Sequence, residues 1–187
     1  MRAFIAIDLP DSVRAVLDER QRAFRALCPD ARWSRPEGIH LTLKFLGEIS
    51  AAQVEKVTGA LANLPGFDPF EIQVKGFGFF PDARRPRVFW AGLEAPPALA
   101  ELAARVEAAM EPLGFAREER PYTPHLTLAR FKIPRAQPAL QKLLGQEAAA
   151  ADESLPIGRF EASEFFLFES KLSPQGAVYA KVARFPR

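Results

Sequence analysis

The tetrapeptide His40-Leu41-Thr42-Leu43 occurs a second time as His125-Leu126-Thr127-Leu128, and the two copies use both histidines of the 187-residue chain. The match extends upstream, because Arg35-Pro36 and Arg120-Pro121 precede the two histidines at the same spacing. Identical residues recur at the same offset of 85 positions elsewhere, at Phe4 and Phe89, Ala6 and Ala91, and Leu17 and Leu102. We interpret this as a duplicated unit that carries one motif in each copy.

Hydrophobic periodicity around the motifs predicts alternating helices and strands. Apolar residues at helical spacing predict helices at 11–27, 50–65, 97–113 and 136–151. Buried or alternating runs predict strands at 3–8, 39–46, 69–75, 87–93, 125–132, 159–168 and 177–184. This order indicates an α+β fold with antiparallel sheets and helices on one face of each. We expect residues 1–187 to form one domain of two pseudo-symmetric lobes, contributed by the halves 1–94 and 95–187, with the active cleft between them.

The composition excludes several classes of protein. Hydrophobic residues make up 48% and charged residues 26% of the chain, which is typical of a folded soluble domain. The longest apolar run, Ala3–Ile7, is far shorter than the roughly 20 residues of a membrane span. A single cysteine, Cys28, excludes a disulfide framework within one chain and favours the cytoplasm. The net charge of +2 means that any contact with nucleic acid requires a local basic patch.

The motif residues point to acid–base chemistry. On a strand, residues at i and i+2 share a face, so His40 and Thr42 point one way, and so do His125 and Thr127. Two histidines with added carboxylates could bind zinc or iron, but within the motifs the histidines are accompanied by Leu and Thr. A paired general acid and base is favoured, because imidazole titrates near pH 6.5 and one ring can be neutral while the other is protonated. In-line displacement at phosphorus needs such a pair.

The remaining polar groups of the motifs fit the same chemistry. The hydroxyls of Thr42 and Thr127 can donate hydrogen bonds to phosphate oxygens as their charge grows. Arg130 follows His125 by five residues and either adds a cation to the site or is a solvent-exposed charge at the strand end. No metal ligand set is expected.

The paired motifs resemble the signature of the 2H phosphoesterase superfamily. The stretches HLTLKFLGE, at His40–Glu48, and PHLTLAR, at Pro124–Arg130, are similar to the two motifs of the LigT-like RNA 2′,3′-cyclic phosphodiesterases of bacteria and archaea, which were earlier named 2′-5′ RNA ligases. The stretches RAFIAIDLP and RVFWAGL also look like this family. The resemblance covers essentially the whole chain.

This resemblance implies two α+β lobes around a cleft, without a metal or nucleotide cofactor. It implies hydrolysis of RNA 2′,3′-cyclic phosphate ends to 2′-phosphates, and small cyclic nucleotides are also candidate substrates. Carried over by motif, His40 is the proton donor and His125 the proton acceptor, while Thr42, Thr127 and Arg130 bind the substrate. Because the two motifs are identical, the sequence itself does not decide which histidine is the acid.

Three other functions compete with hydrolysis. The same acid and base could join RNA ends through a 2′-5′ linkage without ATP, and the absence of any Gly-Lys dipeptide argues against a Walker A loop. A non-catalytic module that binds RNA ends is the second alternative, and a metal-dependent phosphatase is the third. The run Arg84–Arg87 either meets an RNA backbone or is a solvated turn, and Trp33 and Tyr122 either stack on a base or pack in the protein. We expect a monomer.

Overall fold

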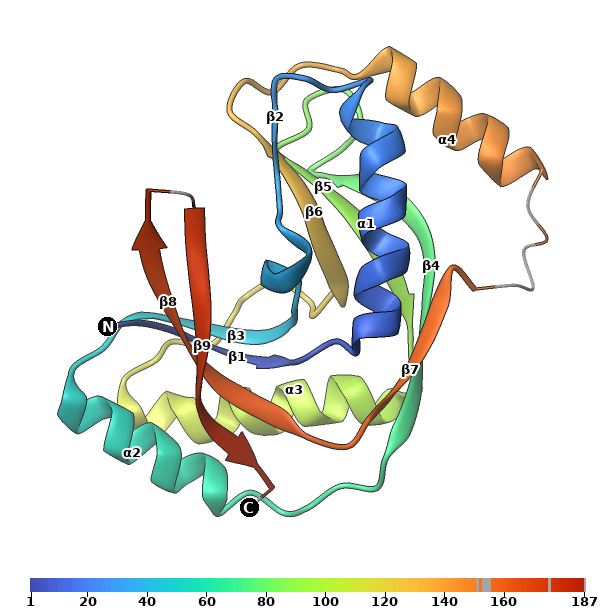
Figure 1. Ribbon diagram of the computed structural model, residues 1–187. Coiled ribbons are helices and arrows are strands. Elements are labelled where there is room, and N and C mark those ends of the chain that lie inside the picture. Colours follow the sequence, from blue (N-terminus) through green and yellow to red (C-terminus); the bar gives the residue numbers. More distant parts are fainter. Residues whose placement is uncertain (151, 153–155, 175, 187) are drawn as a thin grey trace.

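The computed structural model describes residues 1–150, 152, 156–174 and 176–186, and it has the predicted α+β fold (Figure 1). The strands are β1 (Arg2–Ile7), β2 (Ala31–Trp33), β3 (Leu41–Glu48), β4 (Phe70–Phe80), β5 (Val88–Glu94), β6 (His125–Phe131), β7 (Gly158–Ala162), β8 (Phe165–Ser173) and β9 (Gly176–Phe185). The helices are α1 (Asp11–Arg25), α2 (Ala51–Ala62), α3 (Pro97–Met110) and α4 (Pro138–Ala150), with short 3₁₀ turns η1 (Pro36–Gly38) and η2 (Glu111–Leu113). Residue 151, the expected end of the last helix, lies outside the described residues.

The strands form two antiparallel sheets that do not follow the two halves of the chain. One sheet has the order β3-β1-β8-β9 and the other the order β2-β6-β5-β4-β7, so each sheet contains strands from both sides of residue 94. The expectation that each half forms its own lobe is therefore wrong. The physical reason is the pairing of β5 with β6 across the boundary between the halves, and of β8 with β1, which lie far apart in sequence.

The expected strand at 159–168 is also two strands. The chain leaves β7 in the five-stranded sheet and enters β8 in the four-stranded sheet, with only residues 163 and 164 between them. A short break of this kind leaves the apolar pattern nearly continuous, so periodicity alone does not reveal the change of sheet.

Helices α1 and α3 each pack against the sheet that does not contain the strand preceding them. Helix α1 follows β1 of the four-stranded sheet, but it contacts β2 and β7 of the other sheet and buries Leu17 and Phe24. Helix α3 follows β5 of the five-stranded sheet and contacts β3 and α2 (Figure 1). At α2, Ser50 and Gln53 form the expected capping box, in which each side chain bonds the other residue's backbone. One core cluster joins the helices to both sheets.

Both motif strands contain a β-bulge at the same position. In β3 the extra residue is Leu43, which lies between the residues paired with Ala6 and Ile5 of β1. In β6 the extra residue is Leu128, at the position equivalent to Leu43 under the offset of the repeat. A bulge interrupts the alternation of faces, so residues beyond it change sides relative to a regular strand.

The bulge in β3 buries a lysine. Lys44 follows Leu43, and both are buried. The Lys44 ammonium donates to Glu107 Oε2 of α3 at 2.6 Å and to the carbonyl of Ala116 at 2.8 Å. This contact ties the first motif strand to α3 and to the segment that leads to the second motif.

We predict that Lys44→Ala lowers the free energy of unfolding by about 2–3 kcal/mol, because it leaves the partly buried Glu107 carboxylate without its cation. The double variant Lys44→Met/Glu107→Leu should recover most of that loss, since well-packed apolar residues can replace a buried ion pair at little cost. Urea unfolding followed by circular dichroism measures both effects. A double variant as unstable as Lys44→Ala would contradict this role of the ion pair.

Candidate active site

His40 lies immediately before β3 in a nearly closed aromatic environment. Its ring centroid is 4.4 Å from that of Phe168 and 5.3 Å from that of Tyr179, and only 9% of the residue is exposed. The ring Nδ1 is 3.0 Å from the carbonyl oxygen of Gly38. A carbonyl oxygen only accepts hydrogen bonds, so Nδ1 carries the proton and Nε2 is the free reactive nitrogen of the neutral ring.

His125 has the same arrangement at the start of β6. Its Nδ1 is 2.8 Å from the carbonyl oxygen of Thr123, also two residues earlier in the chain. The ring of Phe80 packs edge-on against it, with 5.0 Å between centroids. Both histidines are therefore held in the tautomer that leaves Nε2 free, which suits one ring to accept a proton and the other to donate one.

The sheet register places each threonine on the face of its histidine. In the five-stranded sheet, His125 is paired with Gly92 and Thr127 with Trp90, and these two residues of β5 share a face. In the other sheet, Thr42 is paired with Ala6, on the face of β1 that also carries Phe4. His40 precedes the paired residues of β3, but its ring centroid lies 5.7 Å from that of Phe4, so His40 is on the same face as Thr42.

The two bulges bring one further side chain to each face. Arg130 is paired with Val88, two residues before Trp90, so it lies on the face of Thr127, and it is exposed. Its equivalent in the first motif is Phe45, which is paired with Phe4 and has its ring 6.1 Å from that of Phe4. The residue is 67% exposed, which is unusual for phenylalanine. Phe45 was not predicted, although it follows His40 at the spacing that separates Arg130 from His125.

Hydrogen bonds tie the segment before each motif to the other motif strand. The Tyr122 hydroxyl donates to the carbonyl of Thr42 at 3.2 Å. The amide of Ser34 donates to the carbonyl of Leu128 at 2.8 Å. The buried Gln21 amide group donates to the carbonyls of both Ser34 and Leu128. These contacts fix the two motif strands relative to each other.

The two aromatic residues before the motifs have packing roles. Trp33 donates through Nε1 to the carbonyl of Cys28 at 3.2 Å, and its ring meets the core residue Phe89 edge-on. Tyr122 is partly buried beside the first motif, and burial raises the pKa of its phenol. Neither residue is placed as a free stacking surface for a base.

Asp8 approaches the reactive nitrogen of His40. Its Oδ1 lies 3.8 Å from His40 Nε2 and 2.5 Å from a guanidinium nitrogen of Arg14, while its Oδ2 lies 2.6 Å from the ammonium of Lys181. Burial acts to raise the pKa of the Asp8 carboxyl, but the hydrogen bonds from Arg14 and Lys181 outweigh burial and hold it below its usual value. The residue at the equivalent position of the repeat is Leu93, so the carboxylate has no counterpart there.

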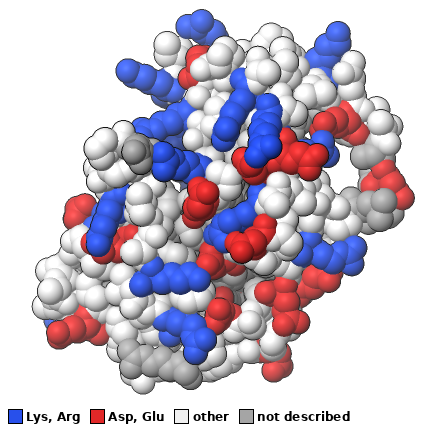
Figure 2. Space-filling view, in the orientation of Figure 1, with Lys and Arg blue, Asp and Glu red and all other residues white. Residues whose placement is uncertain are grey.

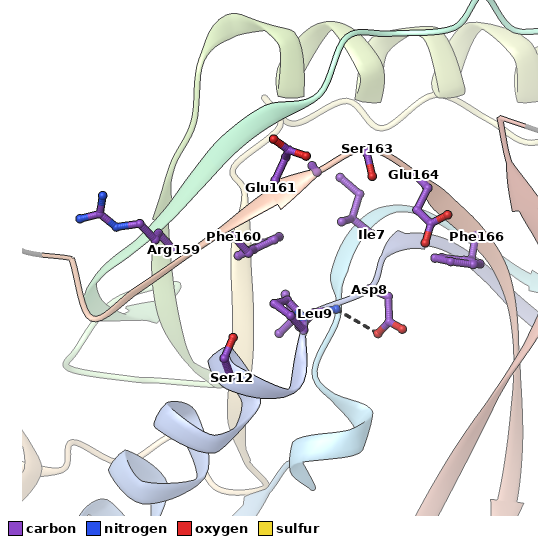
Figure 3. A pocket seen from close by; sticks show the side chains of 12 residues that line it. Ile7, Asp8, Leu9, Ser12, Arg159, Phe160, Glu161, Ser163, Glu164 and Phe166 are labelled. Carbon is purple, nitrogen blue, oxygen red and sulfur yellow. Dashed lines mark hydrogen bonds between the residues drawn. The ribbon is translucent and has the colours of Figure 1, made fainter.

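Two cavities adjoin Asp8. One, of about 300 Å³, also contacts Arg14, His40, Tyr179 and Lys181. The other, of about 440 Å³, lies between the end of β1, the start of α1 and the β7–β8 connection (Figure 3). In this second cavity the Asp8 carboxylate accepts a hydrogen bond from the amide of Leu9 (Figure 3). Asp8 therefore stands at the junction of the two cavities.

Burial controls the protonation of His40. It lowers the pKa of the ring to about 4, the Asp8 charge acts in the opposite direction, and the Arg14 charge adds to the lowering. In the unliganded protein at neutral pH, the His40 ring is therefore neutral. An anion placed beside it would favour the protonated form.

Three further properties of the described residues concern metal binding, membrane spans and the single cysteine. Among them, no group of three or more His, Cys, Asp or Glu side chains is placed to hold a metal ion. None of the helices in the described ranges is long and apolar enough to cross a membrane. The single cysteine, Cys28, is buried, and burial raises the pKa of its thiol to about 11.

Comparison with known proteins places the chain in a family. The family described as LigT-like phosphoesterase matches residues 7–90 and 93–179. The chain belongs to the LigT-like phosphoesterases. The resemblance to 2H phosphoesterases seen in the sequence is thereby confirmed, and the two matched stretches correspond closely to the two halves of the repeat.

Relatives of this family match the chain over its full length. An RNA 2′,3′-cyclic phosphodiesterase of Methanothermobacter thermautotrophicus is 33% identical over 186 residues, covering 99% of this chain and 98% of the relative. A crystal structure from Thermus thermophilus superposes with a TM-score of 0.77 at 30% identity, covering 99% of this chain and 97% of the other. The structure of E. coli LigT complexed with 3′-AMP superposes with a TM-score of 0.73 at 26% identity, covering 98% and 96% of the two chains.

The buried state of His40 predicts a pH-dependent stability. The pKa of the ring is about 4 in the folded protein, against an ordinary value of 6.5. The contribution of the neutral ring is fully present above pH 6.5 and decreases as the pH falls to 4, because the unfolded chain takes up the proton first. We expect a loss of about 3 kcal/mol over this interval. Urea unfolding of the wild type and of His40→Gln at several pH values measures it, and equal pH dependence of the two proteins would contradict the prediction.

Proposed function

We propose that this LigT-like phosphoesterase hydrolyses RNA 2′,3′-cyclic phosphate ends to 2′-phosphates, without a metal ion, through His40 and His125. The observation that carries the proposal is the repeated geometry of the two histidines. In each, a backbone carbonyl two residues earlier accepts from Nδ1 and leaves Nε2 free. The curated relatives, which carry the name RNA 2′,3′-cyclic phosphodiesterase, support the choice of substrate.

In the proposed reaction, His125 Nε2 accepts a proton from water as the water oxygen bonds to phosphorus. The bond from phosphorus to the ribose 3′-oxygen breaks, and His40 Nε2 gives its proton to that oxygen. The product is a 2′-phosphate with a free 3′-hydroxyl. The hydroxyls of Thr42 and Thr127 donate to the non-bridging oxygens, and the Arg130 guanidinium adds positive charge near the second motif.

Asp8 supports the assignment of His40 as the acid. Its carboxylate is 3.8 Å from His40 Nε2 and stabilises the imidazolium form of the ring. The ring of His125 instead meets the apolar edge of Phe80. In the free protein burial keeps His40 neutral, and the phosphodiester anion supplies the extra negative charge that raises its pKa. The acid form is thus assembled together with the substrate.

Phe45 supplies a surface for the base of the terminal nucleotide. It is largely exposed on the face that carries Thr42, and its ring rests beside that of Phe4. An exposed aromatic ring beside a phosphate site suits stacking on a nucleobase of any identity. This fits an enzyme that acts on RNA ends without a strong sequence preference.

We predict that His40→Ala and His125→Ala each lower kcat by about 10²–10⁴-fold while the fold persists, because each removes one proton transfer. The assay uses an RNA that ends in a 2′,3′-cyclic phosphate, in EDTA, with the 2′- and 3′-phosphate products resolved. Circular dichroism of each variant serves as the folding control. Full turnover by either variant would refute the acid–base pair, and activity that disappears in EDTA would refute metal independence.

The same assay separates the alternative functions. Joining of paired RNA ends without nucleotide would favour the ligation reaction. Binding of RNA ends that survives loss of both histidines, with no turnover by the wild type, would favour a non-catalytic reader of RNA ends.

We predict that Phe45→Ala raises the KM for RNA ends about tenfold, because a stacked base contributes about 1–3 kcal/mol. Phe45→Trp should retain the wild-type KM, since the indole offers an equal or larger surface. Steady-state kinetics on the same cyclic-phosphate RNA measures both variants. An unchanged KM in Phe45→Ala would show that the base lies elsewhere.

A further inference from the structure

A group of exposed basic residues gathers at the end of the five-stranded sheet toward which β6 runs from His125. Figure 2 shows several basic side chains over the upper part of the molecule, where β2 begins and β6 ends in Figure 1. We define this basic ridge as Arg32, Arg84, Arg85, Arg87 and Lys132, all of which are exposed. Within the described part of the chain, none of the five takes part in an ion pair.

The ridge is continuous with the second motif strand. Arg32 of β2 is paired directly with Arg130 of β6, and Val88 flanks Arg130 on the other side. The loop between β4 and β5 ends at Arg87, whose carbonyl accepts from the amide of Phe131 at 2.9 Å. A guanidinium nitrogen of Arg87 donates to the carbonyl of Lys132 at 3.2 Å. The loop therefore lies against the end of the strand that begins with His125.

Contacts on several sides hold this loop in place. The amide of Arg87 donates to the carbonyl of Phe80 at 2.7 Å and closes the loop at its base. Gln141 of α4 donates to the carbonyl of Ala83 at 2.9 Å. Asp82, the one carboxylate of the loop, accepts through Oδ1 from the amides of Arg84 and Arg85. The two guanidinium groups thus extend from a loop that is fixed by its own backbone and by α4.

The charges of the ridge exceed what the fold uses, because only the Asp82 carboxylate acts on Arg84 and Arg85 and only Arg87 donates to a backbone carbonyl, that of Lys132, among the contacts of the described residues. Like charges directly opposite each other on neighbouring strands destabilise a sheet, and Arg32 and Arg130 stand in that position. The chain as a whole has a net charge of only +2, so the concentration of arginines here is local. A row of cations without ion pairs, beside the face proposed to hold the phosphate, is the pattern that a polyanion recognises.

We propose that the basic ridge binds the backbone phosphates of the RNA strand that leads to the cyclic phosphate end. This inference rests on the proposed function, because it places the 3′ end of the RNA at the two histidines. His125 and Arg130 are paired with Gly92 and Val88, four residues apart on β5, so at about 3.3 Å per residue Arg130 lies roughly 13 Å along the sheet from His125, and the loop residues of the ridge lie farther out. The ridge therefore contacts nucleotides on the 5′ side of the terminal one, and a cyclic mononucleotide does not reach it.

The test measures two substrates with one double variant of the ridge and one control variant. Arg84→Ala/Arg85→Ala should lower kcat/KM for a ten-nucleotide RNA with a 2′,3′-cyclic phosphate about 10- to 100-fold at low salt, through KM. The slope of log KM against the logarithm of the salt concentration should decrease by about 1.4, since each of the two lost phosphate contacts contributes about 0.7 to this slope for a single strand. Turnover of a 2′,3′-cyclic mononucleotide should stay at the wild-type value. The control variant Lys56→Ala/Arg105→Ala removes the same charge from α2 and α3, and it should leave both substrates unaffected.

The results that would contradict an RNA surface on the basic ridge are distinct from those that would contradict the proposed hydrolysis. An unchanged kcat/KM for RNA in Arg84→Ala/Arg85→Ala, or an equal loss for RNA and mononucleotide, would overturn the ridge as an RNA surface. An equal loss for RNA in the control variant would show that only the net charge matters, which also overturns it. Failure of the proposed function looks different, because the wild type would then turn over neither substrate. In that case anisotropy of a labelled RNA still tests the ridge, and binding unchanged by the variant would refute it.

Discussion

The alternation of faces along a strand is the constraint on which this site depends. A regular strand places residues five apart on opposite faces, so Arg130 would point away from His125 and Phe45 away from His40. The extra residue in each motif strand removes this conflict and brings each of these side chains to the face of its threonine. The same bulge turns Lys44 into the interior, where Glu107 and a backbone carbonyl must satisfy its charge. The ion pair beneath the first motif is therefore a consequence of how the site is built.

Exchange of strands and helices between the halves explains why a repeated chain forms one body. The sheet of the first motif includes β8 and β9 from the second half, and the sheet of the second motif includes β2, β4 and β5 from the first. Neither half can complete its sheet alone: β3 lies at a sheet edge and pairs with β1 of its own half, whereas β6 lies between β2 and β5 and pairs only with strands of the first half. The hydrogen bonds from Tyr122 and Ser34 to the opposite motif strands make the same coupling at the site itself.

The sequence predicts the local features and leaves out those that depend on long-range pairing. Hydrophobic periodicity locates the four helices and most strands, the Ser50–Gln53 capping box is present, and the shared faces of histidine and threonine follow from the spacing of two. The three-residue strand β2 is too short to give a period. The bulges and the exchange of strands depend on which strand pairs with which, and nothing in a local window encodes that. Asp8 ends the first apolar run like any polar residue at a strand end, and only the fold brings it to His40.

Two identical motifs perform an asymmetric reaction only if their surroundings differ. The proposed in-line hydrolysis uses one neutral and one protonated imidazole on opposite sides of the phosphorus. The structure distinguishes the rings by what lies beyond the motif: a carboxylate held by two cations at His40, and the edge of Phe80 at His125. The residues five positions after the two histidines also differ. Phe45 gives the first motif strand an aromatic surface, and Arg130 gives the second a cation. A backbone carbonyl two residues before each histidine keeps Nε2 free in both rings, and in the proposed reaction the different side chains outside the motif give the two rings different roles.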